Sequence, residues 1–251
     1  MKYTDDHCDA RWLAHLLRLG VLPEGFLYPK AERAVREVLR KRAHLVRQRT
    51  ANVRSVPNSL VRNPGVRFRA KRIQALPREE LDRLLPEADQ VLAVTSSLAL
   101  LHCLGQQIKT LEQAVTKRLK HTPAYKQLLS GEGIGAILAQ TLVWETGAMG
   151  RFPTVGTYAS YCRCVQSTKI SNGKRQGQGN VKNGHPYREW ASREAAQFAI
   201  RFSPRVRRFS QRKQAKSHLM VARKAVAHTL SRACYDIMRD LVPLEVHTAF
   251  G

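Results

Sequence analysis

Apolar residues recur every three or four positions across residues 88–119, from Val91 through Leu98 to Leu119. This spacing is typical of a helix with one apolar side, either a coiled-coil-like stripe or the buried face of an ordinary core helix. Gly105 interrupts a strict heptad, so both interpretations stay open. The pattern predicts one long helix or a broken pair over this range.

Shorter periodic segments predict helices on both sides of it. Residues 9–19 place their apolar residues on one face, and residues 31–56 form an amphipathic helix with a basic face. Residues 67–83 are basic with weak structure. Two more helices are expected over 187–202 and 211–240, and there are no internal repeats. The sequence therefore predicts a mainly α fold.

Charge points to a polyanionic partner. The 251 residues include 43 Lys and Arg against 19 Asp and Glu, a net charge of +24, whereas solubility alone asks for about 2 to 8 in a small domain. Residues 163–224 hold sixteen of these cations and only two carboxylates, Glu189 and Glu194. The basic helix 31–56 either lies along a phosphate backbone or has a solvated face. Aromatics are sparse, so contact is expected with phosphates and duplex shape.

Secretion and membrane insertion are both disfavoured. The start has no apolar signal region, and polar residues interrupt the most apolar stretch, 91–104, before it reaches the length of a membrane span. The five cysteines are odd in number and scattered, which fits neither a disulfide framework nor a zinc site. We expect no membrane partner and a cytoplasmic location.

A glycine-rich turn at 130–135 directly precedes an apolar helix. The backbone N–H groups at the positive N-terminal end of such a helix can bind a phosphate. Without a preceding strand or a following acid it is not a dinucleotide fingerprint. A contact like that of a helix-hairpin-helix with the DNA backbone suits the charge better, and we assign it to Gly133 and Gly135.

Residues 171–186 are dense in turn formers and positive charge, which predicts a loop. Ser171 lies in this loop, where its hydroxyl can approach a phosphodiester and neighbouring cations can stabilise the transferring phosphoryl; a serine there is also an ordinary turn residue. His185 either donates to phosphate or has a structural role. Cys162 and Cys164 lack further ligands and are expected to pack in the interior.

Asp6 and Asp9 lie three residues apart at the start of a helix and so share one face. Two carboxylates on one face can share a Mg²⁺ ion whose remaining ligands are water. Acidic residues in a first turn also stabilise a helix without any metal. Both interpretations stay open from the residues alone.

Taken together, the motifs resemble the insertion-sequence 110/116 type transposases, which are related to the Piv-type DNA invertases. The resemblance spans essentially the whole chain and implies DNA cutting and rejoining through a phosphoserine link, by oligomers that pair two DNA segments, with a structured non-coding RNA as guide. The matching pieces are TDDHCDA at 4–10, LLRLG at 16–20, LVRQRT at 45–50, GIG at 133–135, RFPT at 151–154, SNGK at 171–174, GN at 179–180, KNG at 182–184 and EAA at 194–196.

The resemblance also implies site residues. Asp6 and Asp9 match the third and fourth acids of a Mg²⁺-binding tetrad, with Asp5 as a register alternative, and Ser171 matches the nucleophile, with Ser167 as second choice. We expect nucleic-acid contacts from the basic residues of and around the serine loop, namely Lys169, Lys174, Arg175, Lys182 and Arg188.

The implied architecture has three parts: a remnant of an RNase-H-like α/β domain over 1–66, a basic linker with coiled-coil-like helices over 67–120, and a helical C-terminal domain with the serine over 121–251. The first two acids of the tetrad precede the first motif in the family, and this chain starts at Met1 directly before it. Two hypotheses follow: a transposase acting through Ser171, or a truncated derivative that binds DNA or RNA without cutting. We expect binding to survive and catalysis by the isolated chain to be weak or absent.

Overall fold

The computed structural model describes residues 5–22, 25–62, 65–69, 72–73, 75–119, 122–165, 168–178 and 183–251, without the side chains at 31, 168, 169, 175 and 178. Within this part of the chain the fold is mainly α, as predicted. The chain divides into two compact units, residues 1–33 and 34–251. The domain boundaries expected near 66 and 120 stay predictions, as does the RNase-H-like ancestry.

The first unit contains helix α1, Asp6–Arg18. It begins three residues before the predicted start because the carboxylate of Asp5 accepts a hydrogen bond from the Cys8 N–H at 2.7 Å and caps the first turn. Trp12 and Leu17 are exposed, so the apolar face expected from the sequence is present but uncovered.

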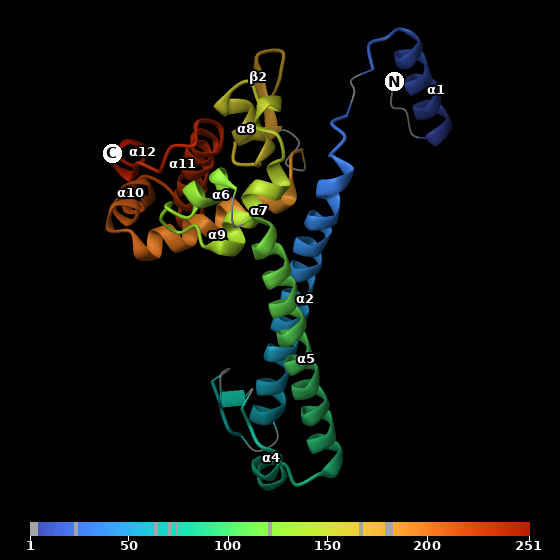
Figure 1. The fold of residues 1–251 in the computed structure, drawn as a ribbon, viewed down its shortest axis with the longest axis vertical. Helices are drawn as coiled ribbons and strands as arrows, with labels where there is room; N and C mark the ends of the chain where they lie inside the picture. The colour runs from blue at the N-terminus through green and yellow to red at the C-terminus, as the bar shows by residue number, and fades with distance from the viewer. Residues whose placement is uncertain are drawn as a thin grey trace. The chain divides into compact units, whose positions relative to one another are not determined.

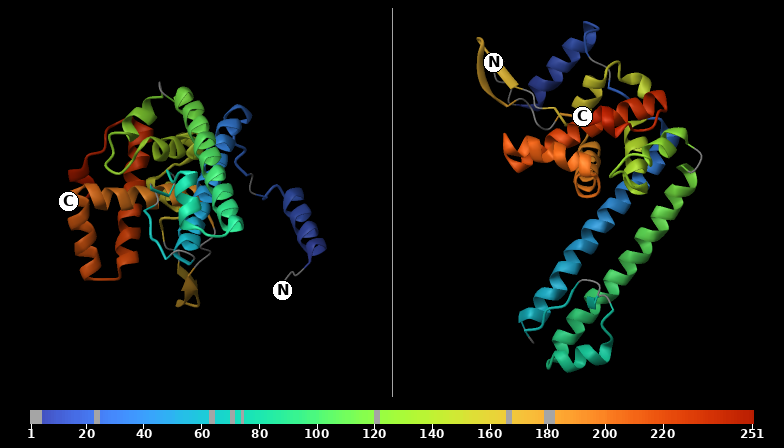
Figure 2. Two further views of the ribbon diagram at one scale, coloured as in Figure 1. Left: turned by 90° about the horizontal axis from the view of Figure 1, so that it is seen from below. Right: turned by 90° about the vertical axis from the view of Figure 1, so that its left-hand side faces the viewer.

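The second unit contains a hairpin of two long helices, α2 and α5, which lie side by side in Figures 1 and 2. Helix α2, Lys30–Arg62, extends past the end predicted at residue 56. Pro57 lies inside it and removes one backbone hydrogen bond. The prediction was wrong because Val56 and Leu60 are both buried on either side of the proline, and packing rather than propensity decides where this helix ends.

Helix α5, Ala88–Leu119, has the predicted bounds and is continuous through Gly105. Its apolar stripe packs against Val56 and Leu60 at the far end of the hairpin and continues into the C-terminal core at Val115 and Leu119. Among the described helices it is the one long and apolar enough to cross a membrane. Because this stripe is packed inside the protein, a membrane protein is not indicated.

The far end of the hairpin is closed by a short helix, α4, Arg78–Leu84. It lies inside the segment 67–83 for which weak structure was expected. Leu81 and Leu85 are buried with Ile73 against the end of α5. This small apolar cluster explains why part of an otherwise basic segment forms a helix.

A helical body occupies the C-terminal half. It consists of α6 (Pro123–Leu128), α7 (Ala136–Thr146), the 3₁₀ turn η1 (Met149–Arg151), α8 (Val155–Tyr161), α9 (Pro186–Phe202), α10 (Pro204–Ala215), α11 (Leu219–Asp240) and α12 (Val246–Ala249). Helix α11 is central and packs on α6, α8, α9 and α10. Its buried side chains include Val226, Leu230 and Tyr235.

The single helix expected over 211–240 is two helices. Ser203 caps α10 by accepting a hydrogen bond from the Val206 N–H, so α10 begins well before residue 211. It ends at Ala215, and the His218 side chain then accepts from the Met220 N–H to start α11. The sequence pattern missed this break because residues 216–218, between the two helices, include neither glycine nor proline. The start of α10 does carry an ordinary signal, a serine N-cap followed by Pro204.

The segment predicted as a loop contains a β-hairpin. Strands β1 (Thr168–Ser171) and β2 (Lys174–Gln178) pair antiparallel, with a bulge after Lys169. Asn172 and Gly173 between them have φ of +50° and +70°, which defines a type I′ turn. Asn-Gly is the strongest local signal for such a hairpin, and the surrounding turn formers obscured it.

Candidate catalytic hairpin and nucleic-acid interface

Ser171 ends the first strand of the hairpin and is exposed. It pairs with Lys174 directly across the two-residue turn. Residues opposite each other in an antiparallel pair project from the same face of the sheet. The serine hydroxyl and an exposed lysine are therefore neighbours at the tip of the hairpin.

The hairpin makes its contacts mainly with itself and projects from the helical body in Figures 1 and 2. The chain is fixed where it returns to the body. The N–H of His185 donates to the Tyr161 carbonyl at 2.7 Å. Gly184 has a φ of +99°, and a Cβ there would lie 2.7 Å from that same carbonyl oxygen. Only glycine fits this close approach, so the return point is rigidly defined.

The entry side is fixed as well. Cys162 is buried, as expected from its lack of metal-ligand partners. Cys164 Sγ lies 3.1 Å from the Ser231 hydroxyl, which in turn donates to Ser192 at 3.1 Å. Burial raises the pKa of both thiols, so they remain protonated at neutral pH. They are packing residues at the base of the hairpin.

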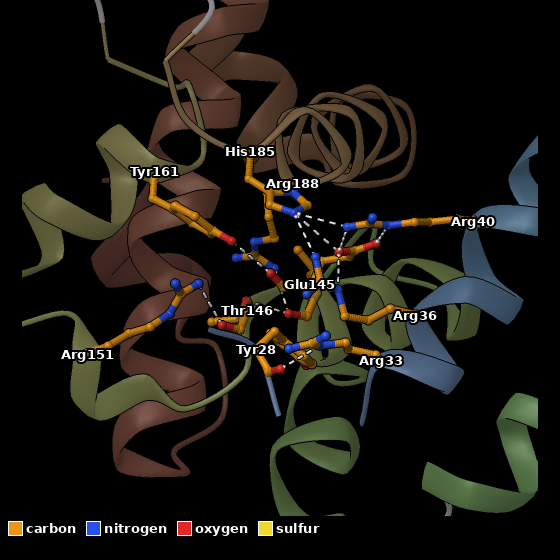
Figure 3. Close-up of polar contacts among 11 residues, drawn as sticks. Tyr28, Arg33, Arg36, Arg40, Glu145, Thr146, Arg151, Tyr161, His185 and Arg188 are labelled. Carbon is orange, nitrogen blue, oxygen red and sulfur yellow. Dashed lines mark hydrogen bonds and ion pairs between the residues drawn. The ribbon is translucent and has the colours of Figure 1, made fainter. Parts of the chain in front are cut away.

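A buried carboxylate, Glu145 of α7, connects this base to α2 (Figure 3). The Arg36 Nε donates to Glu145 Oε2 at 2.9 Å. Arg40 donates to both carboxylate oxygens, from Nε at 2.9 Å and from Nη2 at 2.8 Å. The ring of His185 lies 3.3 Å from Oε2, and the Tyr161 hydroxyl donates to the Glu145 carbonyl. Glu145 therefore joins three parts of the second unit: the hairpin of long helices, α7, and the point where the chain returns from the β-hairpin.

Burial by itself would raise the pKa of Glu145, but the hydrogen bond from Arg40 and the charges of Arg40 and Arg36 outweigh it and hold the pKa below its usual value. Burial lowers the pKa of His185 to about 4, against the opposing attraction of Glu145. The imidazole is therefore neutral at physiological pH, so its approach to Glu145 is not an ion pair, and its Nε2 lies 3.3 Å from Nη2 of Arg36.

Arg188 requires a correction. It was expected to contact nucleic acid, but its side chain is 0% exposed. Its Nη1 donates to the Leu142 carbonyl at 2.9 Å, and the guanidinium carbon lies 4.9 Å from the centre of the Tyr158 ring. Burial lowers its pKa to about 10, so it remains charged at neutral pH. The arginine holds α9 against α7 and α8 and does not reach the surface.

The two glycines of the turn before α7 have different roles. Gly133 has a φ of +86°, and a Cβ there would lie 2.5 Å from both the Ala195 carbonyl oxygen and the Ala199 nitrogen. It therefore allows close packing on α9. Gly135 is the N-cap of α7 and faces open space, so of the two it is the one placed to meet a phosphate. The likeness to a helix-hairpin-helix stays a prediction.

The remaining expected site residues are placed as follows. Asp6 and Asp9 are exposed on the first turn of α1. The described residues contain no group of three or more potential metal ligands, and the assignment of Mg²⁺ to this pair stays a prediction. Lys169 and Arg175 lie in the two strands, and their side chains are outside the described part of the structure, as are Ser167 and Lys182 entirely.

Sequence reasoning missed the Glu145 network. A signal was available, because Arg36 and Arg40 lie one turn apart beside the buried Val35 and Leu39. Glu145 is also the last acid before a long acid-free stretch that ends at Glu189. A lone acid preceding so many cations is a natural partner for buried arginines, but the pairing across more than a hundred residues cannot be derived from spacing.

The hairpin therefore presents an exposed serine beside a lysine, outside the helical body. Residues 125–211, which include the glycine turn, the hairpin and α9, match the model of the transposase IS116/IS110/IS902 family. Over these residues the chain is similar to this family of insertion-sequence transposases, and the match confirms the resemblance seen in the sequence. DNA is the partner that the family implies. No curated protein matches the chain.

Proposed function

We propose that this protein is a DNA transposase in which Ser171 is the nucleophile and the β-hairpin and basic helices bind DNA. One observation carries the proposal: the segment that matches the transposase family contains Ser171, and this serine is exposed opposite Lys174. A nucleophile for a polymeric substrate has to be reachable from solvent, and a nearby ammonium stabilises negative charge on the transferring phosphoryl group.

In the proposed step, Ser171 Oγ attacks the phosphorus of a DNA phosphodiester and loses its proton to solvent. An Oγ–P bond forms while the bond from phosphorus to one sugar oxygen breaks, and that oxygen leaves as a hydroxyl after taking up a proton. The DNA strand is then an ester of the serine. Attack by a sugar hydroxyl of a second DNA end reverses these bonds and releases the protein. The number of phosphodiester linkages is conserved, so no external energy source is required.

Cations supply the binding surface. Between Glu194 and Asp236 the sequence has no acidic residue and ten Lys and Arg. Arg208, Arg212 and Lys213 of α10 are exposed. Because each neutralised phosphate releases counterions, affinity is expected to fall steeply with salt.

Mg²⁺, a structured guide RNA, a homo-oligomeric assembly and a cytoplasmic location belong to the same proposal and rest on the family resemblance. Asp6 and Asp9 of the first turn of α1 would supply two carboxylate ligands to Mg²⁺, with water or further ligands in the remaining positions. No step above passes through the metal.

The test uses labelled DNA from the genomic flanks of the coding sequence, together with RNA transcribed from the same flanks, because the ends of a mobile element adjoin its gene. We expect the full chain with Mg²⁺ to give a covalent protein–DNA adduct on a denaturing gel. Ser171→Ala removes the adduct, whereas Ser96→Ala, a substitution of an exposed serine on α5, keeps it. An adduct that survives Ser171→Ala contradicts the assignment of the nucleophile.

The second candidate is a derivative that binds nucleic acid without cutting it. The placement of Asp6 and Asp9 on α1, with no third ligand among the described residues, favours this candidate. It predicts complexes that dissociate on denaturation and whose affinity falls steeply with salt, with no adduct under any condition. An affinity that barely changes over a fourfold rise in salt contradicts both candidates.

A further inference from the structure

Helix α9 exposes two phenylalanines that the proposed chemistry does not use. Phe198 is 43% and Phe202 66% exposed. Their ring centroids are 6.3 Å apart and the ring planes differ by only 6°, so the two partly exposed rings lie parallel to each other. Large exposed apolar surfaces of this kind usually mark a binding site.

The pair lines one side of a shallow apolar groove. The other side is the glycine turn before α7, including Gly131 and Gly135, with Ile137 from the first turn of the helix. Gly133 holds the turn directly against α9 through its close approach to Ala195 and Ala199. The two walls are therefore fixed relative to each other.

Two arginines lie close to Phe202 at the end of α9. The Arg201 guanidinium carbon lies 5.4 Å from the centre of the Phe202 ring. Arg207 folds back from α10, with Nε donating to the Ile200 carbonyl at 3.2 Å and Nη2 to the Arg201 carbonyl at 2.5 Å. The nearby acids are Glu132, in the same turn but not lining the groove, and Glu194, one helical turn before Phe198.

We propose that this groove binds the unpaired bases of a single-stranded nucleic acid, which stack on Phe198 and Phe202 while Arg201 and Arg207 hold the adjoining phosphates. Aromatic faces beside arginines are the general means by which proteins hold single strands. The inference rests on the nucleic-acid binding in the proposed function but not on the chemistry of Ser171.

Charge distinguishes this occupant from a second copy of the chain. A symmetric contact through the groove would bring Arg201 and Arg207 of one copy against the same residues of the other. With a net charge of +24 per chain, such a contact is opposed by repulsion. A polyanion is attracted by the same residues.

The test measures fluorescence anisotropy of labelled single strands that do not self-pair, oligo(dT) and oligo(U), and of a DNA duplex of equal length. We expect the double variant Phe198→Ala/Phe202→Ala to bind the single strands about fivefold or more weakly, with duplex affinity changed less than about twofold because duplex bases are not free to stack. Leu100→Ala on α5, where the leucine is 44% exposed, is the matched control and leaves all affinities unchanged. Phe202→Trp retains single-strand binding. Comparison of the two single strands shows whether DNA or RNA is preferred.

Equal losses on duplex and single strands, or no loss on either, overturn the inference. The inference is also overturned if light scattering shows that the wild type is a dimer and the double variant is a monomer. It is overturned as well if the wild type binds vesicles that contain anionic lipid and the double variant does not. If the Ser171-dependent adduct forms while the phenylalanine variant binds single strands normally, the inference fails and the proposed function stands. If the wild type binds none of the three probes, both fail.

Discussion

Arg40 and Glu145 are 105 residues apart in the sequence and form two hydrogen bonds, from Nε to Oε1 at 2.9 Å and from Nη2 to Oε2 at 2.8 Å. This bidentate pair fixes α2 against α7. His185, which completes the same network, is the residue at which the chain returns from the Ser171 hairpin. The position of the proposed nucleophile therefore depends on an ion pair between distant parts of the second unit.

Removing the Glu145 carboxylate should destabilise the protein strongly. Glu145→Ala removes the buried carboxylate that accepts hydrogen bonds from Arg36 and Arg40, and we expect the free energy of unfolding to fall by about 2 kcal/mol, less than for a fully buried pair because water reaches the Arg40 side chain. Urea denaturation measures it. The matched control is Glu112→Ala, which breaks the more exposed pair with Arg42 and should cost no more than about 1 kcal/mol. Equal losses in the two variants would contradict the central role of Glu145.

His185 should make stability depend on pH. Its pKa is about 4 in the folded protein against a usual value of 6.5. Between these values the unfolded chain binds a proton that the folded protein does not, so stability falls as pH decreases from 6.5 toward 4. His228, whose pKa burial also lowers, acts in the same direction. Urea denaturation at pH 7 and pH 5 should show a smaller loss for His185→Gln than for the wild type. His218→Gln, on the exposed cap of α11, should keep the full loss.

The glycine turn offers a matched pair of substitutions. Gly133→Ala places a Cβ 2.5 Å from backbone atoms of α9 at a φ of +86°, so we expect a loss of about 2 kcal/mol or more. Gly135→Ala meets open space at a φ of −81° and loses only a favoured N-cap residue, so its effect should stay within about 1 kcal/mol. Thermal or urea unfolding separates the two. If DNA affinity falls in the Gly135 variant alone, that glycine contacts a phosphate.

The β-hairpin should respond independently of the helical body. Gly173→Val puts a β-branched residue at a φ of +70° in the type I′ turn and should disrupt the pairing of Ser171 with Lys174. Because the hairpin contacts mainly itself, the unfolding midpoint of the body should hardly change. The expected readout is loss of the protein–DNA adduct with retained stability. A large drop in stability would show that the hairpin is part of the core.

The spacing of apolar residues predicted those helices that bury a single, regularly spaced apolar face. The stripe from Val91 to Leu119 gave α5 its correct bounds, and the bounds of α9 differed from the prediction by one residue. Helix α2 was predicted too short because Pro57 was treated as a terminator, whereas burial of its neighbours depends on a partner helix that the local pattern does not contain.

The candidate site was predictable only in part. The Ser171 motif was found because its chemistry lies in one short segment, and exposure of the serine agrees with the role proposed for it. The positive charge of Arg188 pointed to phosphate, but a buried carbonyl of Leu142 and the ring of Tyr158 bind it instead. Such partners come from other helices, so residue type alone cannot distinguish a buried arginine from a surface one.

The most direct test of the account is to identify the residue that carries the DNA. Digestion of the covalent adduct with trypsin and nuclease should yield peptide 170–174, cut after Lys169 and Lys174, with a nucleotide esterified to Ser171 and found by mass spectrometry. That result is predicted. A nucleotide on another peptide, or an adduct that forms equally in Ser171→Ala, would contradict the claim that the hairpin serine performs phosphodiester transfer.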